Sequence, residues 1–170
     1  MEKAIKVVNE LQRRGLIRTY AIGRGIATIY YVEPILTYDL DIFFIQPEEE
    51  KEIMSISSIY DFLETKGYKP HKEHIIIENL PVQFLPAYNE LLREAIENAV
   101  EVKYKKTKTR IFRAEYLIAI MIQTSRPKDK ERMIKILDEA EIEKGYLTKI
   151  LRKCGLEEKF ERFVRLYYEE

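Results

Sequence analysis

Tyr20-Ala-Ile-Gly-Arg-Gly-Ile-Ala-Thr-Ile-Tyr-Tyr31, followed closely by Thr37-Tyr-Asp-Leu-Asp-Ile-Phe-Phe-Ile45, is the stretch that decides the fold. It joins a glycine turn to two carboxylates that are one residue apart. In an extended strand, alternate side chains leave the same face, so Asp39 and Asp41 are expected roughly 6.5 to 7 Å apart along the backbone. That spacing lets two carboxylates share divalent cations. The stretch therefore predicts a phosphoryl-transfer geometry.

Composition limits the classes of protein that this chain can represent. Its 170 residues are enough for a hydrophobic core, and its single cysteine, Cys154, excludes an intramolecular disulfide. Lys and Arg number 29, as do Asp and Glu, so the net charge of zero gives no global attraction to nucleic acid or to membranes. The sequence has neither an apolar run near the ~18 residues of a membrane span nor a signal-peptide pattern. A cytoplasmic protein without a membrane partner is expected.

Apolar periodicity and turn residues predict an α+β fold, with a mixed sheet and flanking helices first and a helical bundle last. Ser57 or Ser58 is expected to cap a helix, and residues 105–109 are expected to form a turn. The expected elements are helices over 2–14 and 26–32 with a strand over 19–22 between them, a strand over 40–45, a helix over 60–66, strands over 74–77 and 81–85, a helix over 88–98, a strand over 100–104, and helices over 113–124, 128–140, 145–153 and 157–168.

Four blocks carry a family resemblance: Ala21-Ile-Gly-Arg-Gly-Ile-Ala27, Thr37-Tyr-Asp-Leu-Asp41, Leu80-Pro-Val-Gln-Phe-Leu85 and Glu115 to Asp129. In this order, they resemble the nucleotidyltransferase superfamily of the polymerase-beta type, and within it the minimal prokaryotic members related to AbiEii-type toxins. The resemblance implies a nucleotidyltransferase-like α/β core over residues 1–104. It also implies a C-terminal helical subdomain over 105–170, packed on that core.

The resemblance further implies which residues form the site. Asp39 and Asp41 would be the catalytic carboxylates and would hold Mg²⁺ (or Mn²⁺) beside a nucleoside triphosphate. In the family, a glycine turn and the following helix N-terminus approach the phosphates. The nucleotide-binding residues implied for this chain are Gly23, Arg24, Gly25, Arg126 and Lys128.

Three positions depart from the family pattern. Arg24 stands where the family has Gly or Ser, and its side chain either crowds the turn or helps to hold phosphate. Gln83 stands at the position of the third carboxylate, and an amide cannot act as a base, so Glu78 is a candidate replacement. Met121 stands where many AbiEii-like relatives have a lysine, and a thioether cannot pair with a triphosphate.

Two functions follow from the resemblance and its departures. The first is transfer of a nucleoside monophosphate from a triphosphate to a hydroxyl of a protein or RNA acceptor, with Mg²⁺. The alternative is a catalytically impaired binding module of the same fold, acting with an antitoxin-type protein partner or in a regulatory complex. A purely structural scaffold would leave Asp39 and Asp41 unexplained on an apolar strand, because buried unpaired charges are costly.

Two further readings stay open at the level of sequence. Arg126 and Asp129 either keep phosphate-binding chemistry or form a turn in which Asp129 favours the start of the next helix. A basic cluster either contacts an RNA backbone or is an exposed charged hairpin. The members of that cluster are Lys103, Lys105, Lys106, Lys108 and Arg110.

Overall fold

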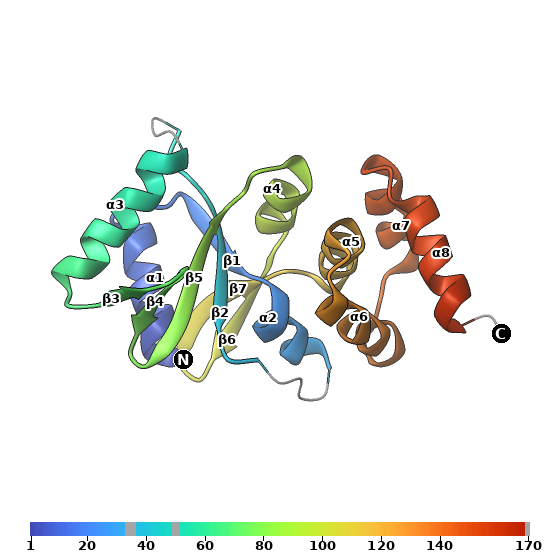
Figure 1. Ribbon diagram of the computed structural model, residues 1–170, viewed down its shortest axis with the longest axis horizontal. Helices are drawn as coiled ribbons and strands as arrows, with labels where there is room; N and C mark the ends of the chain where they lie inside the picture. The colour runs from blue at the N-terminus through green and yellow to red at the C-terminus, as the bar shows by residue number, and fades with distance from the viewer. Residues whose placement is uncertain (33–36, 49–51, 169–170) are drawn as a thin grey trace. The chain divides into compact units, whose positions relative to one another are not determined.

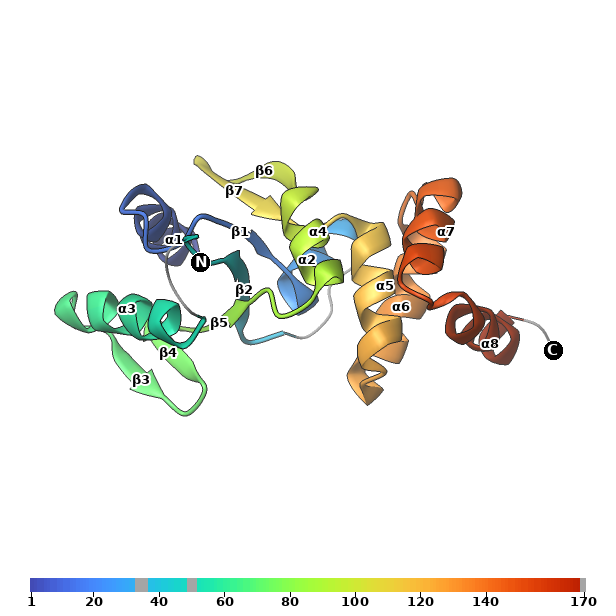
Figure 2. The same cartoon turned by 90° about the horizontal axis from the view of Figure 1, so that it is seen from above.

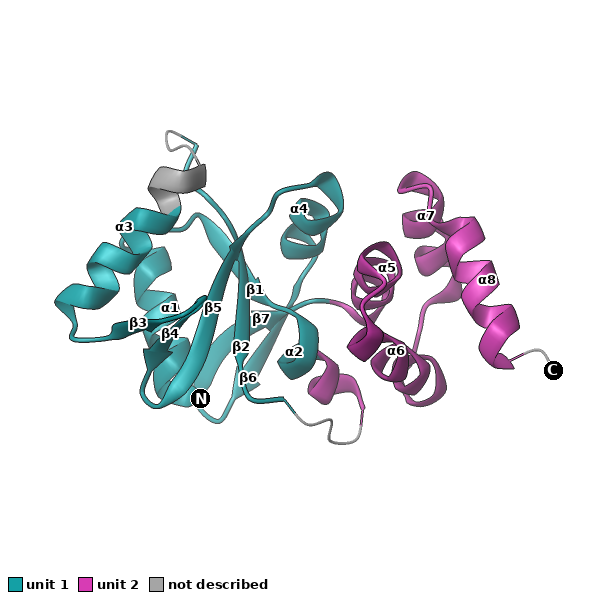
Figure 3. Cartoon of the chain, in the orientation of Figure 1, with its two compact units in different colours: residues 1–27, 36–112 teal, residues 28–35, 113–170 magenta. Residues whose placement is uncertain are grey.

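The computed structural model describes residues 1–32, 37–48 and 52–168. The chain forms two compact units, one of residues 1–27 and 36–112 and the other of residues 28–35 and 113–170 (Figure 3). Pro34, which was expected to end a helix, and residues 49–51 of the acidic run lie outside the described residues. None of the described helices is long and apolar enough to cross a membrane.

The first unit is built on a mixed sheet of seven strands in the order β3-β4-β5-β2-β1-β7-β6. The β1–β7 and β2–β5 pairs are parallel and the others are antiparallel. This arrangement confirms the predicted α+β class. The strands are β1 Thr19–Ile22, β2 Leu40–Ile45, β3 Lys69–His71, β4 His74–Ile77, β5 Leu80–Pro86, β6 Val100–Tyr104 and β7 Thr107–Ile111.

Three helices cover the two faces of this sheet. Helices α1 (Glu2–Arg13) and α3 (Glu52–Thr65) lie on one face, and α4 (Glu90–Glu97) lies on the other (Figures 1 and 2). Because both faces are covered, all six residues of β2 are buried, as its apolar run predicts. The strand that carries Asp41 therefore lies in the core of the unit.

A tight hairpin sets the register of the strand beside β2. Glu78 and Asn79 both have positive φ angles, 51° and 65°, as the two-residue turns that suit strand twist require. The turn pairs Ile77 with Leu80, and β5 then runs parallel to β2 so that Asp41 and Gln83 are neighbours across the two strands. The predicted strands and turn at this place are confirmed, and their register places an amide beside the carboxylate.

The second unit is a helical bundle, as predicted. It contains α5 (Ala114–Thr124), α6 (Pro127–Glu139), α7 (Lys144–Lys153) and α8 (Glu157–Tyr168). Helix α5 is buried from Ala114 to Ile122 and packs against both α6 and α7, because its sequence is apolar on every side. Helix α2 (Arg24–Tyr31) begins in the first unit and ends in the second.

Four local predictions need correction. Helix α3 begins at Glu52, so Ser57 and Ser58 lie within it and neither is its cap; the apolar spacing continues upstream of them. The turn expected over 105–109 is confined to residues 105–106, because Thr107–Ile111 forms β7 with alternate residues buried. The helix expected over 88–98 is shorter, since Asn89 caps it by accepting a hydrogen bond from the Leu92 amide. Strand β3 was not predicted because all three of its residues are exposed.

Candidate functional site

The turn between β1 and α2 is built around a glycine that no larger residue can replace without movement. A Cβ added at Gly23 would lie 2.6 Å from Cε2 of Phe43 and 2.8 Å from Cε2 of Phe112. The Gly23 amide donates a hydrogen bond of 3.1 Å to the carbonyl of Asp41. The turn is thereby fixed against the strand that carries the aspartate.

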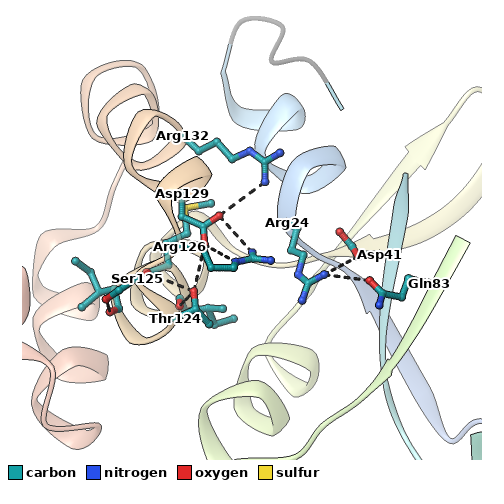
Figure 4. Close-up of polar contacts among 11 residues, drawn as sticks. Arg24, Asp41, Gln83, Thr124, Ser125, Arg126, Asp129 and Arg132 are labelled. Carbon is teal, nitrogen blue, oxygen red and sulfur yellow. Dashed lines mark hydrogen bonds and ion pairs between the residues drawn. The ribbon is translucent and has the colours of Figure 1, made fainter. Parts of the chain in front are cut away.

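Arg24 follows this glycine in a conformation that is unusual for a residue with a side chain. Its φ angle is 50°, in the left-handed region where a Cβ costs about 1 kcal/mol or more. The guanidinium Nη1 donates to Asp41 Oδ1 at 3.0 Å and to Gln83 Oε1 at 3.2 Å (Figure 4). It also lies over the Phe43 ring, with Cζ 5.4 Å from the centroid. The left-handed backbone of Arg24 thus places its guanidinium beside two side chains of the sheet, Asp41 and Gln83.

Asp41 is the buried acid of the site. The residue is 3% exposed, and Arg24 is its ion-pair partner. An isolated buried carboxylate would be costly, and this guanidinium offsets the cost. This contact places the Asp41 side chain at the 23–25 turn. The position expected for a metal cation beside Asp41 is held by a side chain of the protein itself.

Asp39 has different surroundings from Asp41. It lies one residue before β2, and its side chain is 40% exposed. The Thr37 hydroxyl donates to Asp39 Oδ1 at 3.2 Å, and His74 Nε2 lies 3.6 Å from Asp39 Oδ2. The His74 Nε2 atom is buried and has no hydrogen-bond partner among the described residues. The contacts of Asp39 therefore form an acid and imidazole pair on the sheet.

His74 is the site residue that sequence reasoning missed. The β3–β4 hairpin pairs it with His71 across strands and leaves His71 exposed. The proximity of His74 to Asp39 depends on β5 lying between β4 and β2. Only a long-range strand order could reveal it.

Within residues 1–32, 37–48 and 52–168, no third carboxylate joins Asp39 and Asp41. Gln83 occupies the paired position on β5, and its Oε1 accepts from Arg24. Glu78, the candidate replacement, lies in the exposed β4–β5 turn, where it accepts hydrogen bonds from Lys3 and Tyr68. These two contacts hold its carboxylate at the hairpin tip.

The arrangement does not fit the Mg²⁺ or Mn²⁺ site that the family resemblance implies. Among the described residues, no group of three His, Cys, Asp or Glu side chains is placed to hold a metal ion. Of the two expected ligands, Asp41 is paired with Arg24. The guanidinium already neutralises much of the Asp41 charge that would attract a divalent cation.

The remaining predicted nucleotide-binding residues are distributed over both units. Gly25 lies in the first turn of α2 rather than in the preceding loop, because the helix already starts at Arg24. Arg126 and Lys128 belong to the second unit, where Arg126 is the N-cap residue of α6 and Lys128 is exposed in its first turn.

Asp129 organises the start of α6. It is 2% exposed, and Arg126 clasps its carboxylate, with Nε 2.9 Å from Oδ2 and Nη2 3.3 Å from Oδ1 (Figure 4). Thr124 Oγ1 lies 3.1 Å from Oδ2, and Arg132 Nη1 lies 3.8 Å from Oδ1. The hypothesis that Asp129 favours a helix start is therefore confirmed, while a phosphate-binding role of Arg126 stays a prediction.

The basic cluster lies on the β6–β7 hairpin. Arg110, whose pKa is lowered by burial, donates hydrogen bonds to Thr19 Oγ1 and to the carbonyls of Tyr20, Glu97 and Ala99. Lys108 pairs with Glu101 at 2.9 Å. Two of the five cations thus have structural contacts, which weakens the cluster as an RNA-binding surface.

Comparison with known proteins supports the fold. No protein-family model and no curated protein sequence matches this chain. A nucleotidyltransferase-like antigenic protein from Paracoccidioides brasiliensis has a similar structure, with a TM-score of 0.57 and 13% identity over 81% of this chain and 75% of that chain. ANT(2")-Ia in complex with adenylyl-2"-tobramycin is also similar, with a TM-score of 0.50 and 16% identity over 95% of each chain.

These similarities, together with the mixed sheet and the turn between β1 and α2, define a fold of the nucleotidyltransferase type. This bears out the nucleotidyltransferase-type fold that the resemblance of the four sequence blocks implies.

Proposed function

We propose that this chain is a nucleotidyltransferase-like protein that binds a nucleoside triphosphate at the Gly23–Arg24 turn. It transfers the nucleoside monophosphate to a hydroxyl of a protein or RNA acceptor. The observation that carries this proposal is the ion pair between Arg24 and the buried Asp41, 3.0 Å long, at the turn that leads into α2. A nucleotidyltransferase-type sheet places the pair at the helix N-terminus, where anions are favoured.

Arg24 is the residue that we expect to meet the phosphates. A guanidinium binds phosphate through two parallel hydrogen bonds, and its side chain here is 27% exposed. The positive φ angle of Arg24 is the kind of backbone strain that accumulates at binding sites. The sequence left two roles open for the Arg24 side chain, crowding the turn or holding phosphate. Its exposure and its backbone strain favour the second role.

Asp39 and His74 are the groups that we infer to receive the proton of the acceptor hydroxyl. Gln83 cannot accept it as a base, whereas the half-exposed Asp39 carboxylate is oriented by Thr37 and lies 3.6 Å from His74 Nε2. The acceptor oxygen then bonds to the α-phosphorus as its proton moves to Asp39. The bond from the α-phosphorus to the bridging oxygen breaks, and pyrophosphate leaves.

Dependence on Mg²⁺ or Mn²⁺ remains a prediction from the family resemblance. The same holds for Arg126 and Lys128 as nucleotide contacts. The transfer step is assigned here to residues of the chain alone. The measurement that decides the metal dependence of nucleotide binding is calorimetric titration of the chain with ATP, GTP, CTP and UTP, each with and without Mg²⁺.

The proposal is tested by transfer from triphosphates labelled at the α-phosphate to the chain itself, to other proteins and to RNA. We expect Asp39→Asn to lower transfer by about 10²-fold or more while nucleotide binding persists. Asp61→Asn is the matched control, because Asp61 is exposed on α3. Transfer that is unaffected by Asp39→Asn would contradict the role of Asp39.

The second candidate function is the catalytically impaired binding module. Such a module would bind an antitoxin-type protein partner or act in a regulatory complex, and it would transfer no nucleotide. The amide of Gln83 at the third carboxylate position is the observation behind it. Nucleotide binding without labelled product would favour this candidate. No binding of any triphosphate would exclude both functions.

A further inference from the structure

A cavity of about 280 Å³ lies within the helical unit, among α5, α6 and α8. Its floor is apolar and formed by four buried side chains, Met121, Ile122, Met133 and Phe163. Met121 is the residue that stands in place of a family lysine. Here its thioether lines the cavity, and such a side chain adapts readily to an apolar or aromatic guest.

An aromatic pair extends the floor toward solvent. The rings of Phe163 and Tyr167 are tilted with centroids 4.7 Å apart, and Tyr167 is 44% exposed. Leu166, which is 71% exposed, also lines the cavity. Exposed apolar side chains that continue a buried apolar floor indicate a binding site rather than scattered surface residues.

The rim of the cavity is cationic. Lys130, Lys159 and Arg162 are exposed, line the cavity and have no ion-pair partner among the residues that the structure describes. The only acid in the lining, Asp129, is already bound by Arg126. The chain as a whole has no net charge. The excess of positive charge at this rim is therefore local, and it is complementary to an anion.

We propose that this cavity binds a small amphipathic organic anion. The ligand has an apolar, aromatic body that lies on the floor and a phosphate or carboxylate group that lies among Lys130, Lys159 and Arg162. A volume of about 280 Å³ admits a ring system of this kind. A small molecule matches the single buried floor better than an RNA strand, which would need a groove that follows its backbone. Arg126, whose role as a nucleotide contact stays a prediction, also lines this cavity, but the proposal rests on the apolar floor and on the three other cations and does not depend on the transferase proposal.

The experiment is calorimetric titration of the full chain, without nucleotide, with 2-naphthyl phosphate. We expect one probe per chain, and binding at least tenfold tighter than that of 2-naphthol or of inorganic phosphate. Lys159→Glu combined with Arg162→Glu is expected to weaken the probe at least tenfold, because the rim then repels the phosphate. Lys149→Glu, which changes an exposed lysine on α7 away from the lining, is the matched control.

A second variant tests the apolar half of the site. Leu166→Ser removes an exposed apolar side chain, so it leaves the fold intact and is expected to weaken the probe at least threefold. Circular dichroism confirms that each variant is folded.

Several outcomes would overturn the proposal. They are absence of probe binding at millimolar concentration, equal binding of 2-naphthol, equal binding of inorganic phosphate, or unchanged binding to the charge-reversed variant. Displacement of the probe by an RNA oligonucleotide that binds more tightly through the same cations would also overturn it, in favour of a nucleic-acid surface.

Discussion

Arg24 neutralises Asp41 across a turn that the backbone of Arg24 itself helps to form. Its Nη1 atom lies 3.0 Å from Asp41 Oδ1 while its φ angle is 50°. The ion pair and the strained backbone make opposite contributions to stability. Substitutions at this one position can therefore separate them.

Arg24→Ala and Arg24→Gly both remove the partner of a buried carboxylate. We expect Arg24→Ala to lower the free energy of unfolding by about 1–3 kcal/mol. Arg24→Gly should be more stable than Arg24→Ala by about 1 kcal/mol, since glycine adopts a positive φ without a Cβ penalty. Urea unfolding of both variants at neutral pH measures the difference. Equal stability of the two would contradict a left-handed backbone at residue 24.

Gly23→Ala adds a methyl group that would overlap sterically with the rings of Phe43 and Phe112. The nearest ring atom would be 2.6 Å away, and both rings are buried, so neither can move aside freely. We expect a loss of about 1–3 kcal/mol in thermal or urea unfolding. Gly145→Ala is the control. It meets nothing within 4 Å, lies in α7, and should stabilise the chain by about 0.5–1 kcal/mol.

Asp129→Ala removes the carboxylate that binds Arg126, the N-cap residue of α6, and Thr124, the last residue of α5. We expect a destabilisation of about 2–3 kcal/mol, because the Arg132 side chain, only 14% exposed, also loses its ion pair. Glu131→Ala, on the exposed face of the same helix, should change stability by less than about 0.5 kcal/mol. A similar effect of the two variants in urea unfolding would show that the Asp129 contacts contribute nothing.

Because of Tyr31, the stability of the folded chain is expected to fall at alkaline pH. Burial, with the nearby charge of Glu115, raises the pKa of Tyr31 from 10.0 to about 12. The phenol is neutral in both states below pH 10, so stability is full there, and it falls as pH rises toward 12 because the unfolded chain ionises first. Allowing for partial exposure, the loss is about 1–2 kcal/mol.

Tyr31→Phe should lack this part of the alkaline loss in urea unfolding measured from pH 9 to pH 12. Tyr30→Phe, at a neighbouring position that is 58% exposed, should retain it. Identical pH profiles for Tyr31→Phe and the unmodified chain would exclude Tyr31 as the source.

Local patterns in the sequence predict most of the elements. The apolar run of β2, interrupted only by Asp41, and the helical spacing of α1 are such local patterns, and the structure confirms both elements. Elements with a weak or mixed hydrophobic pattern are not predicted from the sequence. Lys108 and Arg110 made β7 look like a charged turn, although Thr107, Thr109 and Ile111 alternate toward the interior.

The candidate site was predicted in part. The closeness of Asp41 to the glycine turn follows from the order of strand, turn, helix and strand. The partners of each carboxylate do not, because the reach of Arg24 to Asp41 and of His74 to Asp39 depends on side-chain conformations and on strands far apart in the chain. The apolar spacing of α5 likewise suggested only a core helix, and the cavity beside it required the placement of α8.

The interior position of β1 in the sheet has a consequence during synthesis. Residue 22 ends this strand, yet its parallel neighbour β7 ends 89 positions later, at residue 111, so one row of amide and carbonyl groups on β1 waits for most of the first unit to be translated. A nascent chain paused before that point carries an open sheet edge, which invites chaperones or pairing with another nascent polypeptide. Slow elongation ahead of the β6–β7 hairpin would therefore raise misfolding.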